Sequence, residues 1–249
     1  MANWSDPRSG MAPFGAAVDA RGAAYDEGLR AYMLSVYNYM TSAVLLTGVV
    51  ALGVYASGAI QALVNVQTGG LSALGWIVAL APLGIVFAMS FGQARMATGT
   101  LQALFWAYAG LLGASLSTLF IAYTASSIAG AFFATAAGFA GLSLYGYTTK
   151  RDLSAFGTFL IIGLVGIIVA SLVNMFLHSG PLGLVISVLG VLIFAGLTAW
   201  DTQKTKAMYS YVAGTPDEGR VKIMAALNLY LDFINMFLFI LSLFGSSRN

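Results

Sequence analysis

Asp232 is a single carboxylate inside an otherwise apolar segment near the end of the chain. It stands in the run LNLYLDFIN at 227–235, between two asparagines. Asn228 precedes it by four positions and Asn235 follows it by three, so in a helix the three polar side chains share one face. A face with a carboxyl and two amide groups predicts a site for protons or cations that looks into a bundle or a water-filled cavity.

The expected depth of Asp232 determines its chemistry. If Lys222 marks the inner interface, Asp232 lies about 15 Å deep, near the middle of a hydrocarbon layer about 30 Å thick. A charged aspartate there costs at least about 2.5–3.5 kcal/mol. Because this cost favours the neutral acid, we expect Asp232 to exchange a proton within the physiological pH range.

Asp201 is the second carboxylate of interest, and its position allows two interpretations. It is either an interfacial aspartate paired with a nearby lysine such as Lys204, or a carboxylate that faces Asp232. Two carboxyl groups in contact share a proton and titrate as a pair. Once deprotonated they form a hard-oxygen site suited to Ca²⁺, to which Asn228 and Asn235 would add amide oxygens.

The composition places these residues in a membrane. Hydrophobic residues make up 59% of the chain and charged residues only 8%, whereas soluble domains carry about 25% charged residues. The uncharged stretches exceed the roughly 20 residues that cross a bilayer. We therefore expect an all-α polytopic membrane protein, with a polar cytoplasmic tail at 1–30 and one transmembrane domain at 31–249. Its predicted spans are 34–56, 73–91, 102–122, 127–147, 156–177, 182–200 and 223–244.

Lysine and arginine predict the orientation. With a cytoplasmic N-terminus, every basic residue except Arg248 falls on the inner side, in agreement with the positive-inside rule. A last segment that re-enters the membrane would place all of them inside, so a six-plus-one topology stays open. The segment TPDE at 215–218 predicts a helix start, with Thr215 as N-cap, Pro216 as first residue and Glu218 as capping partner.

Several functional classes are excluded or weakened by missing residues. The chain has no cysteine, so thiolate chemistry is impossible, and its one histidine, His178, is expected in an exposed outer loop. Retinal proteins need a lysine within a span, and serine intramembrane proteases need a histidine at membrane depth; neither is present. Intramembrane aspartyl proteases remain a rival because they use aspartates on spans six and seven. The glycines that precede one of their aspartates are absent before Asp232.

The chain resembles the Bax inhibitor-1 (transmembrane Bax inhibitor motif) family, and specifically its bacterial members. The resemblance covers most of the chain beyond its first 20 or so residues. The segments that carry it are AYDEGLRAYMLSVYNYM at 24–40, GLSLYGYTTKRDLSAFGTFL at 141–160, IFAGLTAWDTQKTKAMY at 193–209 and LNLYLDFINMFLFILSLFG at 227–245.

The resemblance implies seven transmembrane helices with the C-terminal helix central, wrapped by the other six. It also implies a pH-sensitive Ca²⁺ leak governed by two aspartates, which correspond here to Asp201 and Asp232. In similar proteins a basic residue near the inner end of span two latches onto the span-six aspartate, and Arg95 is the best candidate. Trp200 departs from the pattern, since a tyrosine usually precedes that aspartate.

We therefore expect a pH-sensitive calcium (cation) leak channel that is not an enzyme and has no cofactor, with Ca²⁺ as a permeant or bound ion. The alternative is a non-transporting interaction protein that regulates a partner, such as a membrane AAA protease or a cell-death pathway. The expected surroundings are the lipid bilayer of a bacterial inner membrane, with Ca²⁺ and protons as ligands and no nucleic acid.

Overall fold

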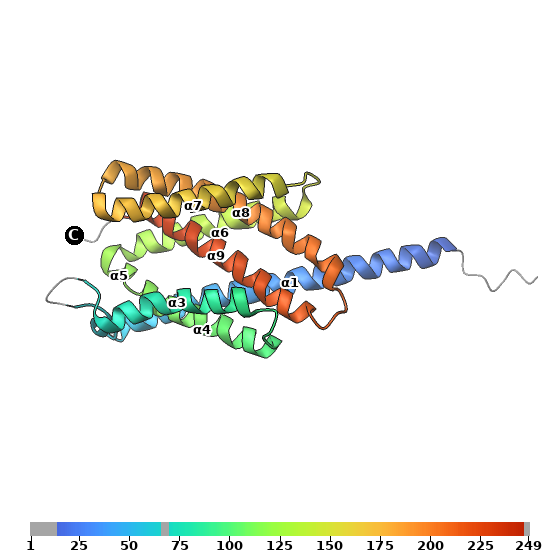
Figure 1. Cartoon of the computed structure of the whole chain (residues 1–249), viewed down its shortest axis with the longest axis horizontal. Coiled ribbons are helices and arrows are strands. Elements are labelled where there is room, and N and C mark those ends of the chain that lie inside the picture. Colours follow the sequence, from blue (N-terminus) through green and yellow to red (C-terminus); the bar gives the residue numbers. More distant parts are fainter. Residues whose placement is uncertain (1–13, 66–69, 247–249) are drawn as a thin grey trace, which may run out of the picture.

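The computed structural model describes residues 14–65 and 70–246, and it describes side chains from residue 23 onward. Each of the long apolar segments forms a helix, as the uncharged runs require in lipid, where the backbone must satisfy its own hydrogen bonds. In the described part of the chain the helices are α1 Phe14–Ala56, α2 Ile60–Leu63, α3 Ala73–Gly92, α4 Thr98–Leu116, α5 Leu119–Ala122, α6 Ala125–Thr148, α7 Ser154–Leu177, α8 Gly180–Val212 and α9 Glu218–Phe244 (Figure 1).

Seven helical segments of the described chain are long and apolar enough to cross a membrane. They contain all the predicted spans, with α4 and the short α5 acting as one segment. The least distinct predicted break, at 123–126, is present: Thr124 ends the connection and accepts a hydrogen bond from the Ser127 backbone N–H. The all-α polytopic class is confirmed. α9 is a continuous helix from Glu218 to Phe244, which favours a full seventh span over a re-entrant segment.

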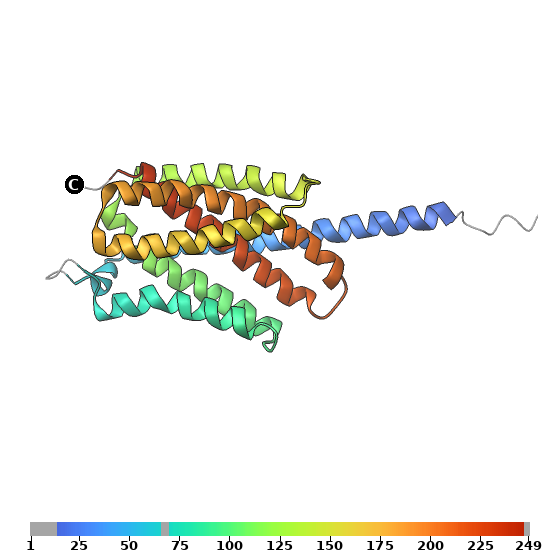
Figure 2. The ribbon, with the colours of Figure 1, turned by 45° about the horizontal axis from the view of Figure 1, so that its top comes forward.

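α9 lies at the centre of the bundle, as the family resemblance implied. It packs against α8, α1, α6 and α4, and Figures 1 and 2 show it running obliquely between the other helices. Leu229, Tyr230, Asp232, Phe233 and Ile234 are all buried, and such a run covers every face of a helix.

The enclosure of α9 by six helices is less even than expected. α3 packs chiefly on α4, and α7 packs chiefly on α8. The outward faces of these two helices carry large exposed apolar side chains, among them Phe91 and Phe176. Such side chains are suited to contact with lipid, since exposed apolar surface of this extent is unusual in a soluble protein.

Two helices extend beyond the predicted spans. α8 continues to Val212, so most of the segment predicted as a loop after Asp201 is helical, and the loop proper is short. The reason is a second buried stripe, since Thr202, Thr205 and Tyr209 recur at helical spacing and are buried. α1 likewise begins at Phe14, within the predicted tail, and projects past the end of the bundle (Figure 1).

The predicted cap of α9 is wrong in its details. The helix begins at Glu218, and Asp217 occupies the N-cap position without a side-chain cap hydrogen bond. Thr215 instead donates its hydroxyl to the Val212 carbonyl, which closes the end of α8. Glu218 accepts the backbone N–H of Gly214 and pairs with Lys222 at 2.7 Å. The TPDE segment thus finishes one helix and starts the next within one tight connection.

Candidate functional site

Asp201 and Asp232 meet at the interface between α8 and α9. The two carboxyl groups lie close enough to interact with each other. Asp232 is almost entirely buried, with 4% of its surface exposed, and Asp201 is half-buried. The sequence left open whether Asp201 pairs with a lysine or faces Asp232, and the structure shows the second arrangement.

Two ionised carboxyl groups in such proximity repel each other, and a proton between them would remove that repulsion. Ionised carboxylates are acceptors only, so two of them hydrogen-bond to each other only when one is protonated. Asp232 Oδ2 is buried, and no N–H or O–H of the described residues donates to it. Lys204 acts on Asp201 only through its field; its ammonium lies 5.0 Å from the centre of the Trp200 ring. The prediction that the two carboxyl groups share one proton stays a prediction.

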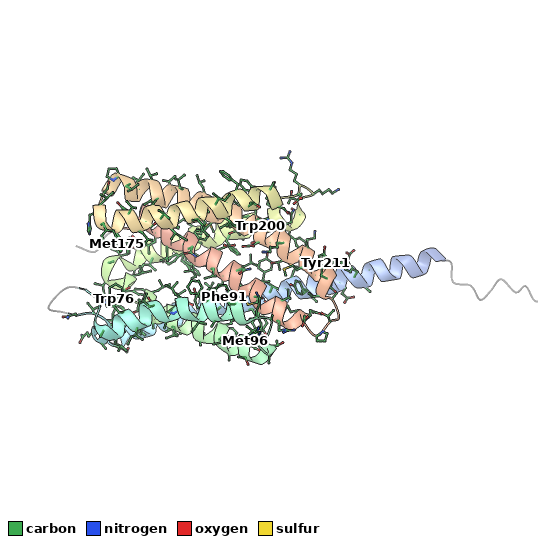
Figure 3. The ribbon with its side chains drawn as sticks, viewed as in Figure 1. Trp76, Phe91, Met96, Met175, Trp200 and Tyr211 are labelled. Carbon is green, nitrogen blue, oxygen red and sulfur yellow. The ribbon has the colours of Figure 1, made fainter. Side chains whose placement is uncertain are left out.

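The Trp200 side chain packs against α7. Its ring packs on Gly157 of α7, where a Cβ atom would collide with the indole. The side chain at this position therefore points toward α7. Figure 3 labels Trp200 on α8.

A polar cavity of about 220 Å³ connects Asp201 to the inner end of the bundle, which we define as the end where Lys204 and Lys222 lie. Asp201 is part of its wall and Asp232 is not, so Asp201 stands between the cavity and the more deeply buried Asp232. The cavity lies between three helices, and its lining comprises Ser90 and Gln93 beside the end of α3, Asp201, Lys204, Thr205 and Met208 of α8, and Val221, Met224, Ala225 and Asn228 of α9.

The two asparagines of the α9 polar face reach different cavities. Asn228 lines the inner cavity together with Asp201. Asn235 lines a separate cavity of about 430 Å³ near the other end of α9, with Ser187 and Ser242. Its amide nitrogen donates to the Leu231 carbonyl at 2.8 Å. A contribution from Asn228 to cation binding beside Asp201 therefore remains a prediction. Asn235 lines the other cavity and is not part of the cavity wall beside Asp201.

Arg95 lies outside the cavity. It is exposed, and no ion pair within the described ranges joins it to a carboxylate. Gln93 and Ser90 face Asp201 from this side instead. The turn after α3 is held to α9 by Arg220, whose guanidinium donates to the Ala94 carbonyl at 3.0 Å. The predicted latch between Arg95 and Asp201 stays a prediction.

A hydroxyl network beside Asp201 was not anticipated from the sequence. Thr202 is fully buried, and its hydroxyl lies 3.4 Å from the Tyr37 hydroxyl of α1 and 3.5 Å from the Ser143 hydroxyl of α6. Thr202 thus ties α8 to two other helices one position from the aspartate. Single hydroxyl residues in apolar helices carry little signal, because most bond to their own helix.

The pair alone does not form a resident metal site. In the part of the chain that the structure describes, no group of three or more histidine, cysteine or acidic side chains converges. His178 is exposed and ends α7 in a left-handed conformation, with φ of 50°, so the prediction of a loop histidine is confirmed. The site is thus a pair of neighbouring carboxyl groups, one of which lines a polar cavity.

The fold and the site define an integral membrane protein with a central helix and a buried carboxyl pair. The chain belongs to the Bax inhibitor-1 family: the family model described as "Inhibitor of apoptosis-promoting Bax1" matches residues 29–249. The chain is 50% identical to the uncharacterized protein RP147 of Rickettsia prowazekii over 226 residues, or 90% of this chain and 93% of that one. It is 44% identical to the inner membrane protein YbhL of Escherichia coli over 223 residues, or 89% and 94% of the two chains.

Proposed function

We propose that this protein is a proton-modulated cation leak of the bacterial inner membrane, with Ca²⁺ as the transported ion. The single observation that carries the proposal is the contact between Asp201 and Asp232, beside a polar cavity at the inner end of the bundle. Ionisable residues inside transmembrane bundles commonly mark ion or proton pathways. The similarity to YbhL, an inner membrane protein of Escherichia coli, supports an inner-membrane location.

The shared proton holds the closed state together. At low pH it joins Asp201 to Asp232 and thereby α8 to α9. When it is lost, two negative charges about 4 Å apart repel by roughly 4 kcal/mol at an effective dielectric constant of 20. A cation entering from the inner cavity relieves that repulsion, and separation of the helices relieves it as well. The leak is therefore expected to rise with pH.

The charge beside the cavity depends mainly on the two carboxyl groups, because most of the residues around them are neutral. α3 contributes only the neutral Ser90 and Gln93 to the cavity, and α9 contributes the neutral Asn228. Among the described residues of the cavity wall, Lys204 of α8 is the one cation, and a positive charge beside a carboxyl group favours its ionised form. Protonation of the two carboxyl groups thus changes the sign of the field that an entering cation meets.

Calcium fits the proposal as cargo rather than as a resident ion. Ca²⁺ takes roughly six to eight oxygen ligands, and two carboxyl groups with one amide supply fewer than that. A cation at this point retains part of its water shell and is held weakly. Weak binding is what conduction requires, because an ion must leave as readily as it enters.

Intramembrane proteolysis is less compatible with the surroundings of Asp232. Leu229 and Leu231 stand where an aspartyl protease has glycines that admit the substrate backbone; Leu229 is fully buried and Leu231 is half-buried. Tyr230 between them is fixed by its hydroxyl, which lies 2.6 Å from the Thr47 hydroxyl of α1. Extended peptide has no open approach to Asp232 between these side chains.

The test is Ca²⁺ flux into liposomes that contain the purified protein, measured across pH. The wild type is expected to exceed empty liposomes, with the flux rising as pH rises, and Asp201→Asn or Asp232→Asn should remove this dependence. Asp152→Asn is the matched control, because Asp152 is exposed in the connection between α6 and α7. Flux equal to that of empty liposomes at every pH would refute the leak and favour a non-transporting role through a partner such as a membrane protease.

A further inference from the structure

A groove between α1 and α6 has a volume of about 710 Å³. α1 packs on α4 and α9, and α6 packs on α8 and α9, so the space between α1 and α6 is closed at the back by α9. Phe233 forms this floor. The rims include Leu34, Leu45 and Leu144, which are 52%, 59% and 64% exposed. A groove with exposed apolar rims at membrane depth opens toward lipid.

The charge along the groove is confined to one end. Arg30 is its only charged lining residue, and none of the ion pairs between described residues involves it. From Arg30 to Leu45 the groove follows α1 for about 22 Å, whereas one leaflet of hydrocarbon is about 15 Å thick. The groove is therefore long enough for an acyl chain whose polar end lies at Arg30.

A second, polar cavity adjoins the charged end. Its volume is about 450 Å³, and Tyr147 belongs to the walls of both cavities. Lys206 lines the polar cavity, with its ammonium 2.8 Å from the Tyr147 carbonyl, and Asp26 is the one acidic residue there. Together with Arg30 these groups leave a net positive charge where a lipid headgroup would lie. Basic pockets between transmembrane helices on the cytoplasmic side bind anionic lipid headgroups.

We propose that the groove binds an anionic phospholipid of the inner leaflet. One acyl chain lies between α1 and α6 on Phe233, and the phosphate lies at Arg30 with the rest of the headgroup toward Lys206. Charge complementarity selects this occupant over an apolar helix from another chain, which would leave Arg30 without an anionic partner. The lipid also enters without a conformational change of the protein, because lipid molecules surround the groove in the membrane.

The site has a connection to the aspartate pair. Tyr37 and Ser143 line the groove and reach the hydroxyl of Thr202, which follows Asp201. Phe233 follows Asp232 on α9. A lipid in the groove therefore touches α9 directly, at Phe233, and α8 only through Tyr37 and Ser143, and is expected to alter the leak. This last step rests on the proposed function, whereas lipid binding itself does not.

The test measures lipid retained by the full-length protein after delipidation and incubation with mixed vesicles of phosphatidylglycerol and phosphatidylcholine. Native mass spectrometry should show phosphatidylglycerol retained in excess. Arg30→Gln should lower this retention about fivefold, as expected for about 1 kcal/mol per basic residue. Lys150→Gln is the matched control, because Lys150 is exposed at the same end of α6 and lines neither cavity; its retention should equal that of the wild type.

A second pair of variants tests the groove itself. Ala140→Phe fills it from the α6 side, whereas Ala137→Phe adds the same ring to an exposed position outside the lining. Retention should fall only with Ala140→Phe. Equal retention of both lipids, or equal losses within either pair of variants, would overturn the proposal. A protein dimer that only Ala140→Phe disrupts would identify a second copy as the occupant. Because retention is measured without flux, failure of the leak would leave this result unaffected.

Discussion

The carboxyl groups of Asp201 on α8 and Asp232 on α9 lie close enough to interact with each other, with Asp232 almost fully enclosed by the bundle. This contact joins α9, the most buried of the spanning helices of the described chain, to α8, which packs against it most extensively. A proton between the two groups makes them act as one titrating unit. The mutual contact, more than either residue alone, is therefore the feature to test.

Infrared difference spectroscopy can detect the shared proton directly. In the wild type we expect a protonated carboxyl band that disappears as pH is raised. Asp232→Asn and Asp201→Asn should each abolish this band, because the remaining carboxylate then accepts a hydrogen bond from the new amide and needs no proton. Asp152→Asn should leave the band unchanged, since Asp152 is exposed. A band that persists in both pair variants would place the proton elsewhere.

Lys204 provides a test of the electrostatics around the pair. Its positive charge favours ionised Asp201, so Lys204→Gln should shift the rise of Ca²⁺ flux to higher pH, by less than about one unit for a solvent-accessible charge. The difference from the wild type should shrink as salt is added, because salt screens exposed charges. Lys150→Gln serves as the control, as Lys150 does not line the cavity. A shift to lower pH would contradict the proposed gating.

The sequence was sufficient to predict the spans and the polar face of α9. Uncharged runs of this length have one stable solution in lipid, which is a helix. The partner of Asp232 was different: the sequence allowed a lysine pairing for Asp201, and only the family resemblance pointed to the second aspartate. Contacts between residues on different helices depend on helix rotation and crossing, which hydropathy does not encode.

The misplaced details have a common cause. The prediction ended the sixth span where apolar residues gave way to polar ones, but the helix continues to Val212 because Thr205 and Tyr209 remain buried. Likewise the family resemblance pointed to Arg95 after α3 and gave no signal for Gln93, which the turn after α3 places in the cavity wall. A helix follows its buried stripe, and the reach of a side chain depends on where the turn begins.

Close packing of α6 on α8 should be sensitive to a single methyl group. A Cβ at Gly146 would collide with the Ala199 carbonyl, whereas a Cβ at Gly141 meets nothing within 4 Å. Gly146→Ala should therefore destabilise the protein by about 1–3 kcal/mol, and Gly141→Ala should be neutral or stabilising by up to about 1 kcal/mol. Thermal unfolding in detergent compares the two. Equal melting temperatures would show that the two helices separate at little cost.

The absence of cysteine makes the topology directly testable, because each introduced cysteine is the only thiol in the chain. Ser57 follows α1 at one end of the bundle and Ser210 lies in the last part of α8 at the other, and both are exposed. With a cytoplasmic N-terminus, a membrane-impermeant maleimide should label Ser57→Cys in intact cells but Ser210→Cys only after permeabilisation. The reverse pattern would invert the predicted orientation.

Ser246→Cys completes this test. Ser246 is exposed beyond the end of α9, and its backbone N–H donates to the Ser127 hydroxyl at the start of α6. A spanning α9 places this residue on the outer side together with Ser57, so both variants should be labelled in intact cells. A re-entrant last segment would instead place it inside and protect it. If Ser246→Cys is labelled only after permeabilisation, as expected for Ser210→Cys, the six-plus-one topology is correct. Asp232 would then lie outside a continuous path across the membrane.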